Sequence, residues 1–66
     1  MDKVKIKFAG HDDFSREVFV TEKGSYVVDV NMDRNNMKLH AKADNDFYGE
    51  PDFPVKTERF EIVDSF

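Results

Sequence analysis

Four carboxylates lie within nine residues of the chain, close enough in sequence to suggest a cation site. They are Asp44, Asp46, Glu50 and Asp52. An EF-hand calcium loop beginning at Asp44 would need an oxygen ligand at its fifth position and a bidentate Glu at its twelfth. Tyr48 and Val55 occupy those positions instead. We therefore expect a solvated acidic loop, with no metal site and no cofactor.

The two histidines do not indicate catalysis. His11 lies beside Asp12 and Asp13, and His40 stands alone. Acid–base or nucleophilic catalysis needs a positioned pair with an orienting group, which neighbours on a short loop do not supply. The chain has 66 residues, and a domain of that size spends its apolar residues on one small core rather than on the walls of a pocket. We expect that the protein is not an enzyme.

Basic residues recur at two-residue spacing in two places. One row is Lys3, Lys5 and Lys7, and the other is Lys38, His40 and Lys42. Residues at this spacing share one face of a strand, so each row predicts a basic stripe that could contact nucleic-acid phosphates. Phe19 and Tyr48 could add base stacking. The formal net charge of −4 argues against this function, and lysines on an edge strand also prevent aggregation. Nucleic-acid binding is therefore the alternative interpretation.

Acidic charge is concentrated toward the end of the chain. Residues 44–66 hold seven acids against Lys56 and Arg59, a balance of −5, whereas residues 1–43 hold seven acids and eight bases, a balance of +1. Aromatic side chains interleave with these acids, and at protein interfaces aromatics supply buried area while charges steer the encounter. We therefore expect a protein partner. The predicted binding residues are Asp44, Asp46, Phe47, Tyr48, Glu50, Asp52 and Phe53.

These residues belong to a long connection, residues 43–57, between two predicted strands. Connections of this length are uncommon in compact domains and tend to be functional or disordered. Pro51 and Pro54 restrict the backbone here, and Gly49 permits a tight turn, so we expect an ordered loop. Phe47 and Phe53 are expected to cap the open end of a small core, whether or not the loop also binds a partner.

Alternating apolar residues predict about five short antiparallel strands near residues 4–8, 17–21, 26–32, 37–41 and 58–63. A three-residue loop with left-handed Gly24 sets Val18 opposite Val28. A four-residue turn at residues 33–36 then sets Val28 opposite Ala41. The resulting inner face is Val18, Val20, Tyr26, Val28, Val30, Met32, Met37, Leu39 and Ala41. Phe19 and Val27 fall on the other face, where they form a candidate homodimer patch.

The expected fold is mainly β: a meander or small curled barrel of SH3 or OB size, with no long helix. The chain is one domain, residues 1–66, because its hydrophobic content of 39% and aromatic content of 14% suit a single small core. It has no Cys and no long apolar run, so we expect a soluble cytoplasmic protein with no disulfide and no membrane partner.

A resemblance to known proteins rests on three stretches of the chain. They are residues 13–16, residues 24–26 and the segment Asn45-Asp46-Phe47-Tyr48-Gly49-Glu50-Pro51-Asp52-Phe53-Pro54. It resembles small uncharacterised proteins carried by phages and conjugative elements of Gram-positive bacteria. The resemblance brings no catalytic or binding residues with it. It implies a genomic setting in which small acidic proteins inhibit or regulate a host system.

Overall fold

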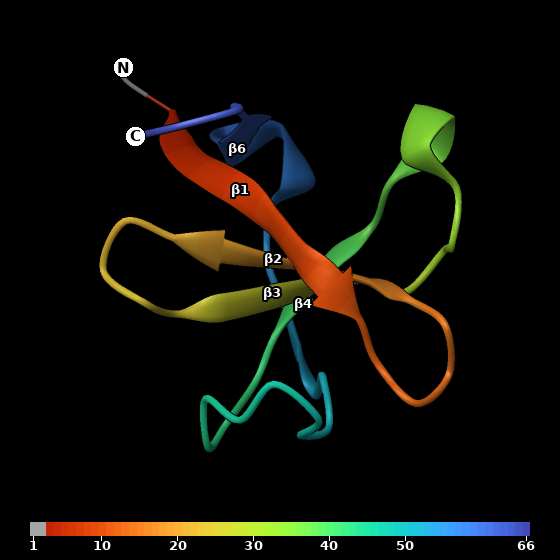
Figure 1. Ribbon diagram of the computed structural model, residues 1–66. Helices are drawn as coiled ribbons and strands as arrows, with labels where there is room; N and C mark the ends of the chain where they lie inside the picture. The colour runs from red at the N-terminus through yellow and green to blue at the C-terminus, as the bar shows by residue number, and fades with distance from the viewer. Residues whose placement is uncertain (1–2) are drawn as a thin grey trace.

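The computed structural model describes residues 3–66 and is mainly β, with 39% of them in strands and 9% in helical turns (Figure 1). The elements are β1 (Val4–His11), β2 (Glu17–Thr21), β3 (Tyr26–Asp29), η1 (Arg34–Asn36), β4 (Leu39–Ala41), β5 (Phe53–Pro54), η2 (Thr57–Arg59) and β6 (Phe60–Ile62). The strands form one curled sheet, half of a barrel, in the order β5-β4-β3-β2-β1-β6. The expected fold class is confirmed. Within residues 3–66, no helix has the length and apolar character needed to cross a bilayer.

The β2–β3 hairpin has the predicted register. Val18 lies opposite Val28, Phe19 opposite Val27, and Val20 opposite Tyr26. Gly24 has a φ of 87°, a left-handed conformation that L side chains rarely adopt. Because the turn needs this conformation at that position, the glycine fixes the loop length and thereby the register of the two strands.

The β3–β4 pairing differs from the prediction by one residue, since Val28 lies opposite His40 rather than Ala41. The cause is Asp29, which is fully buried and ends β3. Its carboxylate accepts hydrogen bonds from three backbone N–H groups, those of Asn31, Asp33 and Lys38. These bonds replace strand pairing and create a longer loop containing η1. The predicted inner face, with Val28 and Ala41 on the same side, is therefore wrong.

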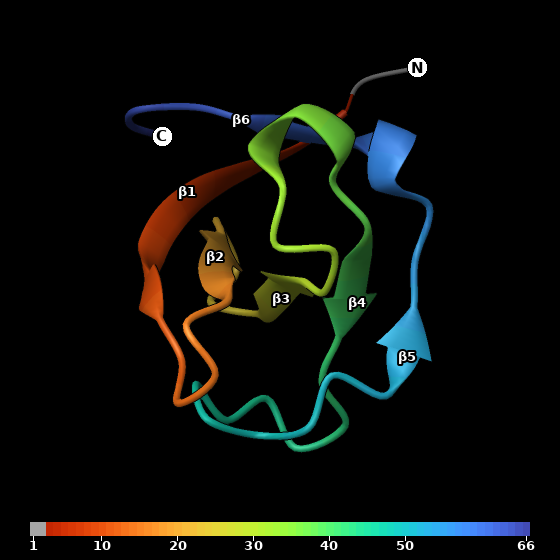
Figure 2. The same ribbon diagram turned by 90° about the vertical axis from the view of Figure 1, so that its right-hand side faces the viewer.

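The sheet also departs from the expected five-stranded antiparallel arrangement in two ways. Phe53 and Pro54 form β5, a sixth strand, against β4. β6 runs parallel to β1, with Val4 opposite Phe60. The chain reaches this position through η2, which carries it from β5 to β6 across the open side of the curled sheet (Figure 2). Local alternation of residues indicates strands but does not indicate which strands become neighbours.

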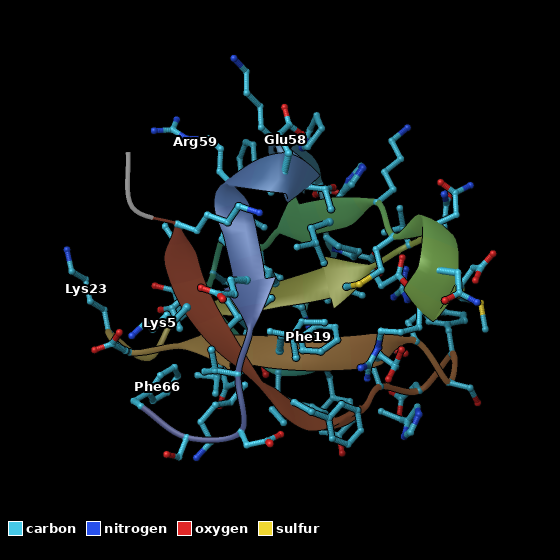
Figure 3. All side chains as sticks on the ribbon, turned by 90° about the horizontal axis from the view of Figure 1, so that it is seen from above. Lys5, Phe19, Lys23, Glu58, Arg59 and Phe66 are labelled. Atoms are coloured by element: carbon cyan, nitrogen blue, oxygen red, sulfur yellow. The ribbon has the colours of Figure 1, made fainter. Side chains whose placement is uncertain are left out.

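The main core lies inside the curl of the sheet. It consists of Ile6, Phe19, Val27 and Leu39, with Met37, Ala41, Val55 and Phe60 packed against them. Figure 3 shows Phe19 near the centre of the curled sheet. Phe19 is 0% exposed and Val27 3% exposed. The two residues cannot form an exposed patch, so the homodimer surface predicted there is wrong: the curl encloses the face that a flat sheet would have exposed.

Candidate functional site

The acidic-aromatic loop, defined as residues 44–54, packs against the outer face of β2 and β3. On that face Val18 and Val28 are each 0% exposed, although neither belongs to the main core. Gly10 lies opposite Val18 and touches the Phe47 ring, while His40 lies opposite Val28 and bonds to the Pro51 carbonyl. The loop therefore covers a second apolar layer, and both faces of the central hairpin are buried.

Phe47 is the half-buried aromatic anchor of the loop. Its ring stands edge-on to the Tyr26 ring, with centroids 5.6 Å apart. A Cβ placed on Gly10 would lie 3.1 Å from Cζ of Phe47, and Gly10 has a φ of 150°. The absence of a side chain at Gly10, next to a bulge in β1 after Phe8, thus makes room for the Phe47 ring.

Lys42 fixes the loop by a polar contact. Its side chain is buried, its ammonium group donates a hydrogen bond to the Phe47 carbonyl, and the Nζ atom lies 5.7 Å from the centroid of the Phe47 ring. Burial lowers the pKa of Lys42, and the nearby carboxylates of Asp12 and Asp46 offset this only in part. Lys42 is therefore not part of an exposed basic stripe, and the prediction that placed it there is wrong.

His40 has a similar structural role. Its Nδ1 lies 2.9 Å from the Pro51 carbonyl oxygen. Because a carbonyl can only accept, Nδ1 carries the proton, and the other ring nitrogen, Nε2, is buried with no hydrogen-bond partner in the part of the chain that the structure describes. The ring is engaged with the loop rather than presented to solvent. His40 therefore does not extend a basic stripe either, and of that predicted row only Lys38 is exposed.

The first half of the loop is held by side-chain to backbone hydrogen bonds. Asn45, at a φ of 52°, accepts from the Tyr26 N–H at 2.8 Å and donates to the Gly24 carbonyl at 3.1 Å. Asp44 and Asp46 each accept from a backbone N–H two residues further along. Turns of this kind restrict the backbone without burying the carboxylates. The prediction of an ordered loop agrees with these contacts.

Other side chains of the loop face solvent. Tyr48 is 62% exposed and Phe53 is 53% exposed. Glu50 and Asp52 are exposed as well, together with Asp44 and Asp46. Phe53 therefore does not cap the core, whereas Phe47 covers the outer layer of the sheet. Of the seven predicted binding residues, Phe47 is an internal anchor and six have exposed side chains. In the part of the chain that the structure describes, no three His, Cys, Asp or Glu side chains gather as a metal site.

The first basic row lies along β1. Lys3 and Lys5 are exposed, and Lys5 lies opposite Glu61 of β6 in the register of the two parallel strands. Lys7 is half-buried, with its Nζ 5.4 Å from the centroid of the Phe66 ring. Lys5 and Lys7 alternate along one face of β1, where an acidic residue of the neighbouring strand and an aromatic ring accompany them.

The connection from β1 to β2 contains a structured turn organised by Asp12. Buried Asp12 accepts hydrogen bonds from the Phe14 and Arg16 N–H groups and from Arg16 Nε, the last at 2.7 Å. Burial alone would raise the pKa of Asp12, but these bonds outweigh burial and lower it. The guanidinium carbon of Arg16 lies 4.8 Å from the centroid of the Phe14 ring. The four-residue spacing of Asp12 and Arg16 is the one sequence signal for this pair.

No family model, curated protein or solved structure matches this chain.

Proposed function

We propose that the protein is a non-enzymatic binding module, an inhibitor or regulator that contacts a protein partner through the acidic-aromatic loop. The observation that carries the proposal is Tyr48, which is 62% exposed although its neighbour Phe47 anchors the loop to the sheet. An exposed aromatic on an already ordered loop loses little conformational entropy on binding. Tyrosine is also among the residues that contribute most to protein interfaces.

The charge beside Tyr48 supports the same proposal. Glu50 and Asp52 are exposed, and neither forms an ion pair with another of residues 3–66. Their carboxylates are free to steer a partner and to align it on the loop. Phe53 adds a second apolar side chain, 53% exposed, at the end of the same segment.

The proposal is tested with Tyr48→Ala and Glu50→Lys, each compared with a matched substitution elsewhere. Phe66→Ala removes an exposed aromatic at the C-terminus, and Glu22→Lys reverses an exposed charge in the β2–β3 turn. All four variants are first checked for the wild-type circular dichroism spectrum. Each is then used as bait in lysate from the cells that carry the gene, and the captured proteins are quantified by mass spectrometry.

We expect the two loop variants to lose a captured protein that both control variants retain. Retention of every captured protein by the loop variants would contradict the assignment of the binding surface to the loop. A cytoplasmic location, suggested by a chain without Cys, is part of the proposal, and fractionation of the same cells tests it.

The β1 lysines support a second candidate, nucleic-acid binding, because Lys3, Lys5 and Lys7 share one outward face. Phosphate contacts of this kind depend strongly on salt. Fluorescence anisotropy with short single- and double-stranded oligonucleotides at about 50 mM salt tests it. Binding that Lys5→Glu abolishes would support this candidate, and no binding at that salt concentration would remove it.

A further inference from the structure

A second loop lies beside the acidic-aromatic loop, at the same end of the molecule. It is the β1–β2 loop, defined as residues 12–16. Figure 2 shows both loops at the end of the curled sheet opposite the chain termini. Gly10, which precedes this loop, touches the Phe47 ring, and Lys42 lies within the electrostatic reach of Asp12 as well as Asp46. The two loops therefore form one continuous end of the protein.

Phe14 and Tyr48 are the two most exposed large hydrophobic side chains among residues 3–66, at 66% and 62%. Contacts with neighbouring residues of the same loop hold each of these side chains in place. Asp12 fixes the backbone of the β1–β2 loop, and Arg16 stacks on the Phe14 ring at 4.8 Å. Phe47 lies 4.8 Å from Tyr48, centroid to centroid, and is itself anchored on the sheet. Each loop thus presents one ordered aromatic ring to solvent.

The charge around these rings is acidic because the local bases are already engaged. Arg16 is paired with Asp12, and Lys42 is buried against Phe47. The remaining exposed carboxylates on the two loops belong to Asp13, Asp44, Asp46, Glu50 and Asp52. A surface of this composition complements a positively charged one, and interfaces are generally arranged so that their potentials are complementary.

We propose that Phe14 and Tyr48 are paired anchors of a single docking surface, and that its partner is a basic protein surface with an apolar recess for each ring. This rests on the proposed function and extends it to the β1–β2 loop and to the charge of the partner. Aromatic anchors surrounded by charges that exclude like-charged partners give both affinity and selectivity.

Site-specific photocrosslinking tests the proposal on the full chain. The photoreactive residue p-benzoylphenylalanine replaces Phe14, Tyr48 or, as a matched exposed aromatic, Phe66. Phe66 is 50% exposed and lies near Lys7, whose Nζ is 5.4 Å from its ring centroid; Figure 2 shows the C-terminus at the end of the sheet opposite the two loops. The three proteins are irradiated in lysate from the cells that carry the gene, and crosslinked peptides are identified by mass spectrometry. Sedimentation velocity on the purified chain detects self-association.

We expect positions 14 and 48 to crosslink to the same protein, through peptides of net positive charge, and position 66 not to do so. With that protein purified, Phe14→Ser and Tyr48→Ala should each weaken binding about 10-fold or more, while Phe66→Ser leaves it unchanged. Raising the salt concentration should slow association, because steering by charge is screened.

Other outcomes separate the two proposals. Crosslinking from position 48 alone would overturn the paired surface and leave the single-loop function standing. Crosslinking from neither position would overturn both proposals. Crosslinks to acidic or neutral peptides would overturn the assignment of a basic partner, and so would crosslinks to a second copy of this chain.

Discussion

Replacing Phe47 by Ala tests whether the acidic-aromatic loop is held by its aromatic anchor. Truncation of a fully buried Phe costs about 3–5 kcal/mol. Phe47 is half-buried, so we expect about 2 kcal/mol, roughly half of that range. A domain of this length has a free energy of unfolding of about 3–10 kcal/mol. The change should therefore lower the melting temperature by about 8–16 °C.

Urea unfolding followed by far-ultraviolet circular dichroism measures this loss, and Tyr48→Ala is the matched control. The two aromatics are sequence neighbours and their rings touch edge to face, but Tyr48 is 62% exposed, so we expect its truncation to cost only about 1 kcal/mol or less. Hydrogen exchange of the Gly49 amide, which bonds to the Asp46 carbonyl, reports on the loop itself. Equal stability of the two variants, with Gly49 exchange unchanged in both, would refute the anchoring role of Phe47.

Three further predictions concern the supports of the fold. Gly10→Ala should cost about 1–3 kcal/mol, because Gly10 has a φ of 150° and the added Cβ would lie 3.1 Å from Cζ of Phe47; thermal denaturation measures the loss, and an unchanged melting temperature would contradict the close packing. Asp29→Ala should cost at least about 3 kcal/mol, because it leaves three backbone N–H groups without their acceptor, and Asp29→Asn should cost less; equal losses on urea unfolding would contradict this account. The pKa values of Asp12 and Glu17 are lowered in the folded protein, so the unfolded chain binds more protons in acid, and stability should fall as the pH drops below about 4.5. The urea midpoint measured between pH 6 and pH 3 tests this, and a midpoint that rises in acid would show that the sign is wrong.

The β2–β3 hairpin was predictable because its determinants are local. Gly24 supplies the left-handed residue of a short turn, and only one loop length pairs apolar residues across both faces. The β3–β4 register was not predictable by the same argument. There the outcome depends on Asp29, whose carboxylate collects hydrogen bonds from residues up to Lys38. An acid at the end of an apolar run gives no sign in the sequence that it will be fully buried.

The candidate site, like the fold, was predictable from the sequence only in part. The sequence indicated an ordered loop with exposed acids and aromatics, because prolines, glycine and Asp turns act locally. It did not indicate that the side chains of Lys42 and His40 form hydrogen bonds with backbone carbonyls of that loop. Two-residue spacing places both on one outward face, and only contacts with Phe47 and Pro51, five and eleven residues further along the chain, turn that face into an interior. Whether the loop binds a partner stays a prediction.

The exposed side chains of the acidic-aromatic loop can be substituted independently of the residues that hold the loop on the sheet. Asn45, Phe47 and Pro51 hold the loop in place, and they are interspersed along the chain with positions such as Tyr48 and Glu50, whose side chains face solvent. Substitution at the exposed positions leaves the supports in place, as in antibody loops that vary on a constant framework. The segment can therefore be randomised at residues 48, 50, 52 and 53 to select new specificities on an unchanged sheet.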